Sequence, residues 1–324
     1  VEKILARHEA LREDWPIDGT TGYEFANLLL HLLADPAGEA APTRIYAEFA
    51  GPSPAFADIV RDSKLWIMRH AMASELNVLT RDAARIARRN PRTADFTRNI
   101  LGRALREVVA AFPVYRTYVD EAAAPSEADR RDLDWAVTQA RRNEPDLDPS
   151  VFDFVHRLLS TDAVAAPRSG FSRHAVTRFA MRVQQYSGPV MAKGLEDTAF
   201  YRHFPLVSLN EVGGDPDRFG VTPKQFHAKN LERSRHWPAG LLATTTHDTK
   251  RGEDARARIN VLSEVPVKWY RAIRRWEVMN AGARTMIDGL SAPDRNEEYL
   301  FYQTLVGTWP VDPMDAAAHG VYVQ

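Results

Sequence analysis

The apolar run GLLATTT at 240–246 is followed directly by His247 and Asp248 and then by a helical pattern. An apolar strand, a polar turn and a helix make one βα unit, and in (β/α)8 barrels the residues at the carboxyl end of each strand face the active site. We therefore predict a strand at 240–246 with His247 and Asp248 at its functional end. The alternative is that Asp248 or Thr249 only caps the next helix, because Asp and Thr are preferred N-cap residues.

Glu2 is a second candidate for chemistry, since it stands beside an apolar pair, Ile4 and Leu5, and could lie at the end of a strand. Taken alone, it is an ordinary solvated side chain. Paired with Asp248 it becomes more interesting, because glycoside chemistry needs two carboxyls: one protonates the leaving oxygen, and the other attacks or stabilises the oxocarbenium-like centre. The two residues lie far apart in the sequence, so only the fold can bring them together.

A Gly-flanked turn, DGTTGYE at 18–24, precedes a helical pattern and presents the ring of Tyr23. It serves either as an N-terminal capping loop or as a contact for sugar hydroxyls, and the residues alone leave both readings open. The turn is too short for a phosphate-binding P-loop and lacks the required Lys.

Charge and composition exclude several classes of function. Forty-two basic residues nearly balance 43 acidic ones, so nothing indicates nucleic acid as a partner. The longest apolar stretch, near 28–33, is interrupted by His31 and is far too short to span a bilayer, so no membrane association is expected.

Metal and cofactor sites are also not expected. The chain has no cysteine, which excludes disulfides and thiolate metal sites and fits a cytoplasmic location. Its ten His residues show no HExxH motif or paired-ligand spacing. We therefore predict neither a metal nor a cofactor.

Most of the remaining chain shows helical periodicity. Apolar residues recur at helical spacing near 25–33, 55–88, 95–112, 128–143, 149–160, 173–186, 223–235, 255–262, 266–289 and 294–308. One segment differs: PVYRTYV at 113–119 is β-branched and aromatic and predicts a strand. The stretch 187–223 is rich in Gly, Pro and aromatic residues and predicts a long, ordered binding loop.

These patterns divide the chain into four segments. Residues 1–52 form a barrel segment with a strand-end acid/base, and 53–186 form a mostly helical insertion. Residues 187–262 carry the binding loop and the His-Asp unit, and 263–324 form a C-terminal helical segment. The first residue is not Met, and the last residues show no terminal tail, so we expect the chain to be cut from a longer protein.

Five runs resemble the maltooligosyltrehalose synthases, members of the α-amylase superfamily in glycoside hydrolase family 13. They occur in the family's order and span essentially the whole chain: VEKIL at 1–5, WPIDGTTGY at 15–23, FPVYRTY at 112–118, MAKGLEDTAFY at 191–201 and TTTHDTKRGED at 244–254.

The resemblance implies roles for these residues. Glu2 corresponds to the general acid/base, His247 to a substrate-binding residue and Asp248 to the transition-state-stabilising carboxylate. The nucleophile, an Asp on an earlier strand, is expected upstream of Val1, so the fragment is expected to be inactive by itself. Further substrate-binding residues are expected at Tyr23, Lys193, Glu196, Asp197, Tyr201, Lys250 and Arg251.

The implied fold is an α-rich α/β structure, an incomplete (β/α)8 TIM barrel with its later strands only and a large helical insertion. The implied reaction is an intramolecular transglucosylation that converts the reducing-end α-1,4 linkage of a maltooligosaccharide into the α,α-1,1 linkage of trehalose. The residues 193–201 and the helical middle of the chain are candidates for a wall that keeps water out. Functional coupling to a trehalohydrolase is a further expectation.

Two other readings remain. Another α-amylase-type hydrolase or glucan transferase, such as a maltooligosyltrehalose trehalohydrolase, would share the Glu and His-Asp chemistry, although the runs KGLEDT and GTTGY favour the synthase. A non-catalytic helical interaction module would explain the helical content but would not need clustered His, Asp, Lys and Arg after an apolar run.

Overall fold

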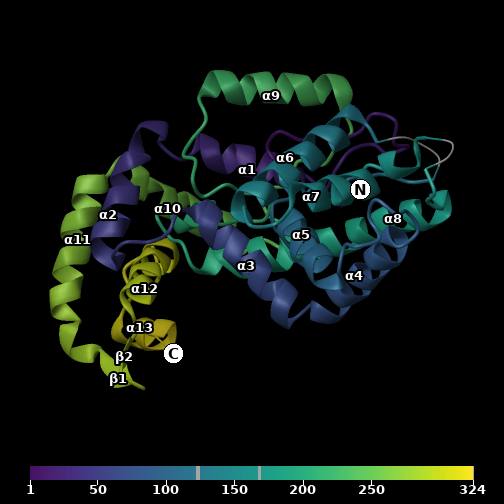
Figure 1. Ribbon diagram of the computed structural model, residues 1–324. Coiled ribbons are helices and arrows are strands. Elements are labelled where there is room, and N and C mark those ends of the chain that lie inside the picture. The colour runs from purple at the N-terminus through teal and green to yellow at the C-terminus, as the bar shows by residue number, and fades with distance from the viewer. Residues whose placement is uncertain (122–124, 167–168, 324) are drawn as a thin grey trace. The chain divides into compact units, whose positions relative to one another are not determined.

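The computed structural model describes residues 1–121, 125–166 and 169–323, and most of them are helical (Figure 1). The chain divides into two compact units. Unit 1 comprises Val1–Lys3, Glu13–Ser53 and His203–Gln324, and unit 2 comprises Ile4–Arg12 and Pro54–Arg202. The predicted α-rich character is confirmed, while the four-segment division stays a prediction.

Unit 2 is a helical assembly with a large apolar core and a separate, smaller apolar cluster formed by Phe56, Ile59, Ala199 and Phe200. Its elements are α3 Phe56–His70, α4 Ala73–Ala87, α5 Arg98–Ala110, α6 Glu127–Asn143, α7 Pro149–Leu159, the 3₁₀ turn η2 Asp162–Val164, α8 Arg173–Met191, the π-helical turn η3 Ala192–Glu196 and the 3₁₀ turn η4 Ala199–Tyr201. Helix starts follow local chemistry: Ser126 and Asp129 form a capping box at α6. The core lies on the apolar stripes of α4, α5, α7 and α8.

Unit 1 holds the remaining elements. They are α1 Tyr23–Leu32, the 3₁₀ turn η1 Pro36–Gly38, α2 Ala40–Ala50, the 3₁₀ turn η5 Val207–Leu209, α9 Pro223–His236, α10 Glu253–Glu264, α11 Pro266–Met279, the 3₁₀ turn η6 Ala281–Ala283, β1 Thr285–Ile287, β2 Leu290–Ala292, α12 Arg295–Thr308 and α13 Ala316–Val323. Its core is rich in aromatic side chains, and the indole of Trp269 donates a hydrogen bond to the Tyr299 hydroxyl at 3.0 Å.

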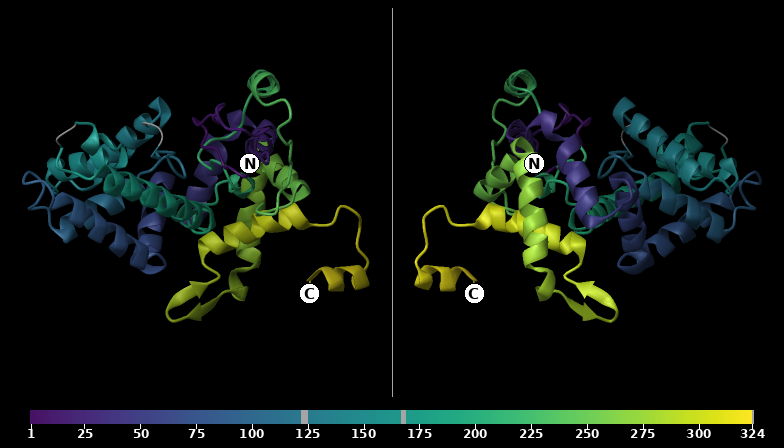
Figure 2. Two further views of the ribbon diagram at one scale, coloured as in Figure 1. Left: turned by 90° about the vertical axis from the view of Figure 1, so that its right-hand side faces the viewer. Right: turned by 90° about the vertical axis from the view of Figure 1, so that its left-hand side faces the viewer.

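Among the described residues, the strands are β1 and β2, which form one antiparallel hairpin. Figure 2 shows it extending beyond the end of α11. Asp288 and Gly289 connect the strands, and both have positive φ, as a two-residue hairpin turn with the twist of the strands requires. The apolar spacing predicts one helix over 266–289. That prediction is wrong after Met279, where the helix ends and the hairpin follows shortly afterwards.

The predicted strand at 113–119 is wrong, because no neighbouring strand pairs with this segment in the described structure. Helix side chains bind its backbone instead: the Gln184 amide accepts from Val119 N at 2.6 Å and donates to Val119 O at 2.8 Å. Buried backbone groups need a partner, and any good donor or acceptor satisfies them. Lys64, Asp129 and Ser187 also bind backbone groups of residues 112–119 through their side chains.

The predicted strand at 240–246 is also absent from the described structure. Leu241 N donates to Thr20 O at 3.3 Å, but no regular ladder follows, and the side chains of Leu241 and Leu242 are 62% and 61% exposed. A strand needs a partner backbone for its alternate N–H and C=O groups. This segment therefore has no regular secondary structure.

Most of the predicted helices are confirmed, with shifted ends. The region 55–88 contains two helices, α3 and α4, and α8 continues past 186 to Met191. Helix α2 was not predicted. None of the helices in the described part of the chain is long and apolar enough to cross a bilayer.

Candidate active site

Tyr23 lies at the centre of a polar cluster in unit 1. It is the first residue of α1, and its side chain is buried. Its hydroxyl is 3.2 Å from Glu2 Oε1 and 3.0 Å from Asp248 Oδ2. The fold thus brings the two carboxylates selected from the sequence to one hydroxyl.

His247 completes the cluster. Its Nε2 lies 3.5 Å from Glu2 Oε1 and 3.7 Å from Asp248 Oδ1. The side chains of Glu2, His247 and Asp248 are 52%, 73% and 47% exposed, so a ligand from solvent can reach all three. The arrangement is an open polar site with one buried member, Tyr23.

The electrostatics of the site keep Tyr23 protonated. Burial, followed by the neighbouring carboxylates of Asp248 and Glu2, raises the pKa of Tyr23 to about 12. A phenol with this pKa is a hydrogen-bond donor throughout the neutral range. Tyr23 can therefore donate to a carboxylate throughout the neutral range.

The Gly-flanked turn brings Tyr23 and the segment after Trp237 close together. Gly22, the N-cap of α1, has φ 93°, and a Cβ at this position would lie 2.7 Å from Leu241 O. A Cβ at Gly19 would lie 2.6 Å from the Cα of Gly240. Two backbones can approach this closely only where side chains are absent. The glycines therefore allow the turn at 18–22 to pack on the segment that leads to His247.

Hydroxyl side chains shape the turn that carries His247 and Asp248. Thr246 N donates to Thr249 Oγ1 at 2.8 Å, and Asp248 N contacts Thr246 Oγ1 at 3.3 Å. Helix α10 begins only at Glu253, with Gly252 as its N-cap. The alternative that Asp248 or Thr249 caps this helix is therefore wrong. Thr249 closes the preceding turn instead.

Lys250 and Arg251, both selected from the sequence, are half-buried at the end of this turn. Their backbone amides donate to the two carboxylate oxygens of Glu211, at 2.7 and 2.9 Å. Glu211 was not selected from the sequence. In the sequence, Glu211 stands out only as an acidic residue in a Gly-rich loop. Its residue type does not indicate which backbone amides its carboxylate binds.

Four selected residues lie in unit 2: Lys193, Glu196, Asp197 and Tyr201. Glu196 is buried and forms a hydrogen bond with the Tyr115 hydroxyl, whereas the other three are exposed. The π-helical turn η3 packs closely on α3, since a Cβ at Gly194 would lie 2.9 Å from the Cα of Lys64. The loop predicted at 187–223 is therefore wrong in its first part, where α8 continues to Met191 and the helical turns η3 and η4 follow.

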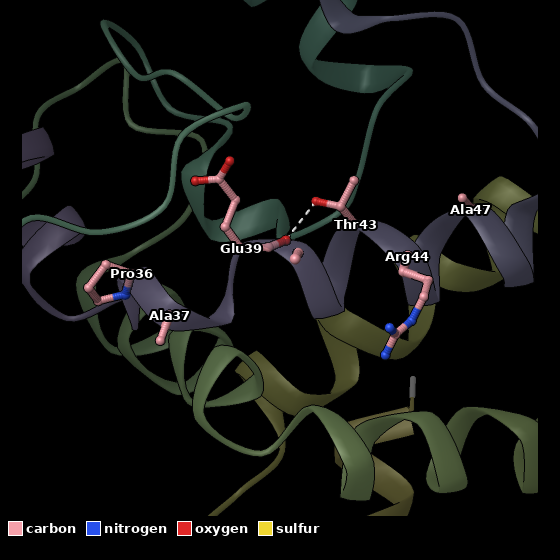
Figure 3. A pocket seen from close by; sticks show the side chains of 7 residues that line it. Pro36, Ala37, Glu39, Thr43, Arg44 and Ala47 are labelled. Atoms are coloured by element: carbon pink, nitrogen blue, oxygen red, sulfur yellow. Dashed lines mark hydrogen bonds between the residues drawn. The ribbon is translucent and has the colours of Figure 1, made fainter.

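A shallow hollow in unit 1 lies on the face of η1 and α2 (Figure 3). It is lined by Pro36, Ala37, Glu39, Ala40, Thr43, Arg44 and Ala47. Thr43 Oγ1 donates to the Glu39 carbonyl at 2.8 Å, an ordinary contact within the helix. None of the residues selected from the sequence lines this hollow, and its groups suggest no chemistry.

Comparisons with known proteins point to one family. A curated protein of Mycobacterium tuberculosis, named provisionally as a maltooligosyl trehalose synthase, is 36% identical over 319 residues, which cover 98% of this chain and 36% of that protein. The solved maltooligosyltrehalose synthase from Arthrobacter ramosus superposes with a TM-score of 0.76 at 35% identity, covering 96% of this chain and 36% of that one. Over nearly its whole length, the chain is therefore similar to about a third of a maltooligosyltrehalose synthase.

A more distant structure agrees. A hypothetical maltooligosyl trehalose synthase from Sulfolobus tokodaii superposes with a TM-score of 0.69 at 28% identity, covering 95% of this chain and 35% of that one. No family model matches the chain. The chain thus spans about a third of the length of the synthases that it matches.

The cluster of Glu2, His247 and Asp248 also has the spacing of a metal site. One ligand atom each from Glu2, His247 and Asp248 lie within 4.8 Å of one another. All three side chains are exposed, and exposed acidic groups of this kind are common without a metal ion. The absence of a resident metal stays a prediction, and a chelator tests it.

Proposed function

We propose that this chain carries the acid/base and the transition-state-stabilising carboxylate of a maltooligosyltrehalose synthase. The whole protein would convert the reducing-end α-1,4 linkage of a maltooligosaccharide into an α,α-1,1 linkage, as a (1→4)-α-D-glucan 1-α-D-glucosylmutase. The observation that carries the proposal is the meeting of Glu2 and Asp248 at the Tyr23 hydroxyl, beside His247.

The proposed reaction has two displacements. A nucleophilic Asp, supplied by residues upstream of Val1, attacks C1 of the penultimate glucose while Glu2 protonates the oxygen of the departing terminal glucose. That glucose turns in its pocket, and Glu2 removes the proton of its anomeric hydroxyl. The hydroxyl oxygen then attacks C1 and displaces the Asp, so two inversions give net retention.

The Tyr23 hydroxyl can form a hydrogen bond with Glu2 both when Glu2 is protonated and when it is ionised. A phenol has one proton and lone pairs on its oxygen. It can therefore donate to Asp248 while it accepts from a protonated Glu2, and it can donate to either carboxylate after Glu2 has given up its proton. The 3.2 and 3.0 Å distances support both arrangements without a change of position.

Asp248 and His247 are proposed to act on the sugar itself. An ionised Asp248 would stabilise the positive charge that develops at C1 and the ring oxygen. His247 is exposed and would bind glucose hydroxyls, with Lys250 and Arg251 contributing hydrogen bonds and charge.

We also propose that unit 1 belongs to a (β/α)8 barrel in the full-length protein. The exposed Leu241 and Leu242 support this, because the rest of the barrel would cover these apolar side chains. Residues 113–119 are not part of this proposal, because helix side chains already bind their backbone.

The residues Lys193, Glu196, Asp197 and Tyr201 are proposed to belong to the wall that excludes water from the glycosyl intermediate. Water exclusion matters because hydrolysis would release glucose in place of rearrangement. Tyr201 is 53% exposed and offers a ring for stacking on sugar. Replacing Tyr201 by Ala should raise the ratio of glucose to α,α-1,1 product, and an unchanged ratio would remove it from the wall.

The proposed setting is the cytoplasm, in keeping with a chain that has no cysteine. The product, a maltooligosaccharide ending in trehalose, would be the substrate of a trehalohydrolase. Functional coupling to such an enzyme is part of the proposal, with no nucleic acid, membrane or cofactor involved.

The decisive experiment uses a protein of the full family length that contains this chain. Maltopentaose is added, and proton NMR follows the reducing-end anomeric signals. The proposal expects these signals to disappear and an α,α-1,1 linkage to appear. Glucose and shorter maltooligosaccharides alone would instead assign the chain to a hydrolytic relative.

A further inference from the structure

The turn from Thr244 to Arg251 carries His247 and Asp248, yet no strand ladder holds it in the described structure. Its position must therefore come from side chains. Arg256, which is buried in α10, binds Thr244 O and lies 3.3 Å from Thr245 Oγ1. This anchors the beginning of the turn to α10.

Glu211 anchors the end of the turn. Its side chain is buried, with a relative exposure of 3%, and its Oε2 and Oε1 accept from Lys250 N at 2.7 Å and Arg251 N at 2.9 Å. Two consecutive backbone N–H groups form a concave anion site, and hydrogen bonds to an ionised acceptor are about twice as strong as neutral ones. The carboxylate thus binds the turn in a bidentate manner.

Glu211 is itself tied to the helix that carries Tyr23. The Asn27 amide, one turn into α1, donates to Tyr23 O at 2.9 Å and to Val212 O at 2.8 Å. Val212 follows Glu211 directly in the chain. Hydrogen bonds from Asn27 to Val212 and from Glu211 to the turn of Asp248, joined by the Glu211–Val212 peptide bond, therefore connect α1 to that turn.

The charge of Glu211 is costly to bury, which argues against an incidental contact. Burial raises the pKa of Glu211, while the amides of Lys250 and Arg251 and the guanidinium groups of Arg256 and Arg251 act in the opposite direction. A Gln would avoid the desolvation cost but offers only one good acceptor oxygen. The second oxygen is useful only if both amides must be bound.

We propose that Glu211 is a positioning residue, which fixes the turn of His247 and Asp248 relative to Tyr23 through Lys250 N and Arg251 N. The expected effect of Glu211 on catalysis rests on the proposed function. Its role in holding the turn does not depend on that function. Glu211 does not touch the reacting groups, and its effect passes through the backbone.

The test compares Glu211→Gln with Glu232→Gln in the full-length protein. Glu232 lies on α9, is 57% exposed and contacts Lys229, so its substitution makes the same chemical change at an exposed position. Hydrogen exchange read by mass spectrometry should show faster exchange in the peptide covering 244–252 of the Glu211 variant alone. With α,α-1,1 product as the readout, kcat should fall by about 10- to 100-fold, with a smaller change in KM.

The outcomes of these measurements separate the positioning role of Glu211 from the proposed function. Unchanged exchange at 244–252, or faster exchange spread evenly over unit 1, would overturn the positioning role. If wild-type protein makes no α,α-1,1 product while the local exchange still changes, the proposed function fails and the anchoring stands. If circular dichroism shows that Glu211→Gln does not fold, Glu211→Asp replaces it: the shorter carboxylate keeps its charge but reaches one amide, and the same local change is expected.

Discussion

The Tyr23 hydroxyl donates a hydrogen bond to Asp248 Oδ2 at 3.0 Å, although 225 residues separate the two in the chain. The contact joins the first residue of a helix to a turn that has no regular secondary structure. It depends on a glycine turn, a close backbone approach and a buried acid. Each of these can be changed separately, and each change has an expected outcome.

Tyr23→Phe removes the hydroxyl and keeps the buried ring. We expect the protein to fold and kcat for α,α-1,1 product to fall by about 10- to 100-fold, because Glu2 and Asp248 lose their common hydrogen-bond partner. Initial rates with maltopentaose measure the effect. Tyr270→Phe, on the partly exposed face of α11, is the matched control. Equal rates for both variants would show that the Tyr23 hydroxyl plays no part.

Glu2→Gln tests the acid/base role. An amide cannot exchange a proton with the leaving oxygen, so kcat should fall by about 10²- to 10⁴-fold. A substrate with an activated leaving group that needs no protonation should recover the first displacement only. A Glu2→Gln variant that retains full activity with maltopentaose would assign the acid/base to another residue.

Gly22→Ala tests the close approach of the two backbones. Gly22 and Gly289 have φ of 93° and 81°, but only at Gly22 would a Cβ meet other atoms, Leu241 O at 2.7 Å, whereas nothing lies within 4 Å at Gly289. Both substitutions carry backbone strain of about 1–2 kcal/mol. Urea unfolding should show a larger loss for Gly22→Ala, and activity should fall for that variant alone. Equal losses of unfolding free energy in the two variants would show that the backbone at Leu241 moves away from the added methyl group without cost.

Because Lys64 is buried, we expect the free energy of unfolding to depend on pH. Its side chain is buried, donates to Phe112 O at 3.1 Å, and has a pKa lowered by burial to about 7. Below pH 7 both the folded and unfolded states hold the proton, and the folded state bears the full cost of burying the charge. Between pH 7 and the ordinary lysine pKa the unfolded chain binds more protons, so the free energy of unfolding rises with pH, by an amount on the order of a few kcal/mol.

Lys64→Met should abolish this rise, whereas Lys229→Met, at a position with a 61% exposed side chain, should not. Urea unfolding at pH 7, 8 and 9, followed by circular dichroism, measures the slope. A parallel rise in wild type and Lys64→Met would place the titrating group elsewhere.

Treatment with EDTA tests the absence of a resident metal. Glu2, His247 and Asp248 have suitable spacing for an ion, but the proposed reaction requires none. The rate of α,α-1,1 product formation should be the same before and after exhaustive dialysis against EDTA. A loss that Zn²⁺ or Mn²⁺ restores would contradict a metal-free mechanism.

The local sequence determined most helices, because apolar spacing and capping residues act within a few turns. Examples are α6 with its Ser126 cap and α9, which begins at Pro223 after Thr222. The strands at 113–119 and 240–246 were predicted wrongly for one physical reason. A strand is stabilised by backbone partners that are distant in sequence, and β-branched composition does not reveal whether those partners are strands or the side chains of helices.

The same division applies to the site. The sequence alone selected Glu2, His247 and Asp248 through their residue types and their resemblance to a family. Only the tertiary structure decided that they meet at the Tyr23 hydroxyl, and that Glu211 holds the turn from Lys250 to Arg251. Residue type fixes what a group can donate, accept or transfer, whereas the partner it finds depends on how distant segments pack.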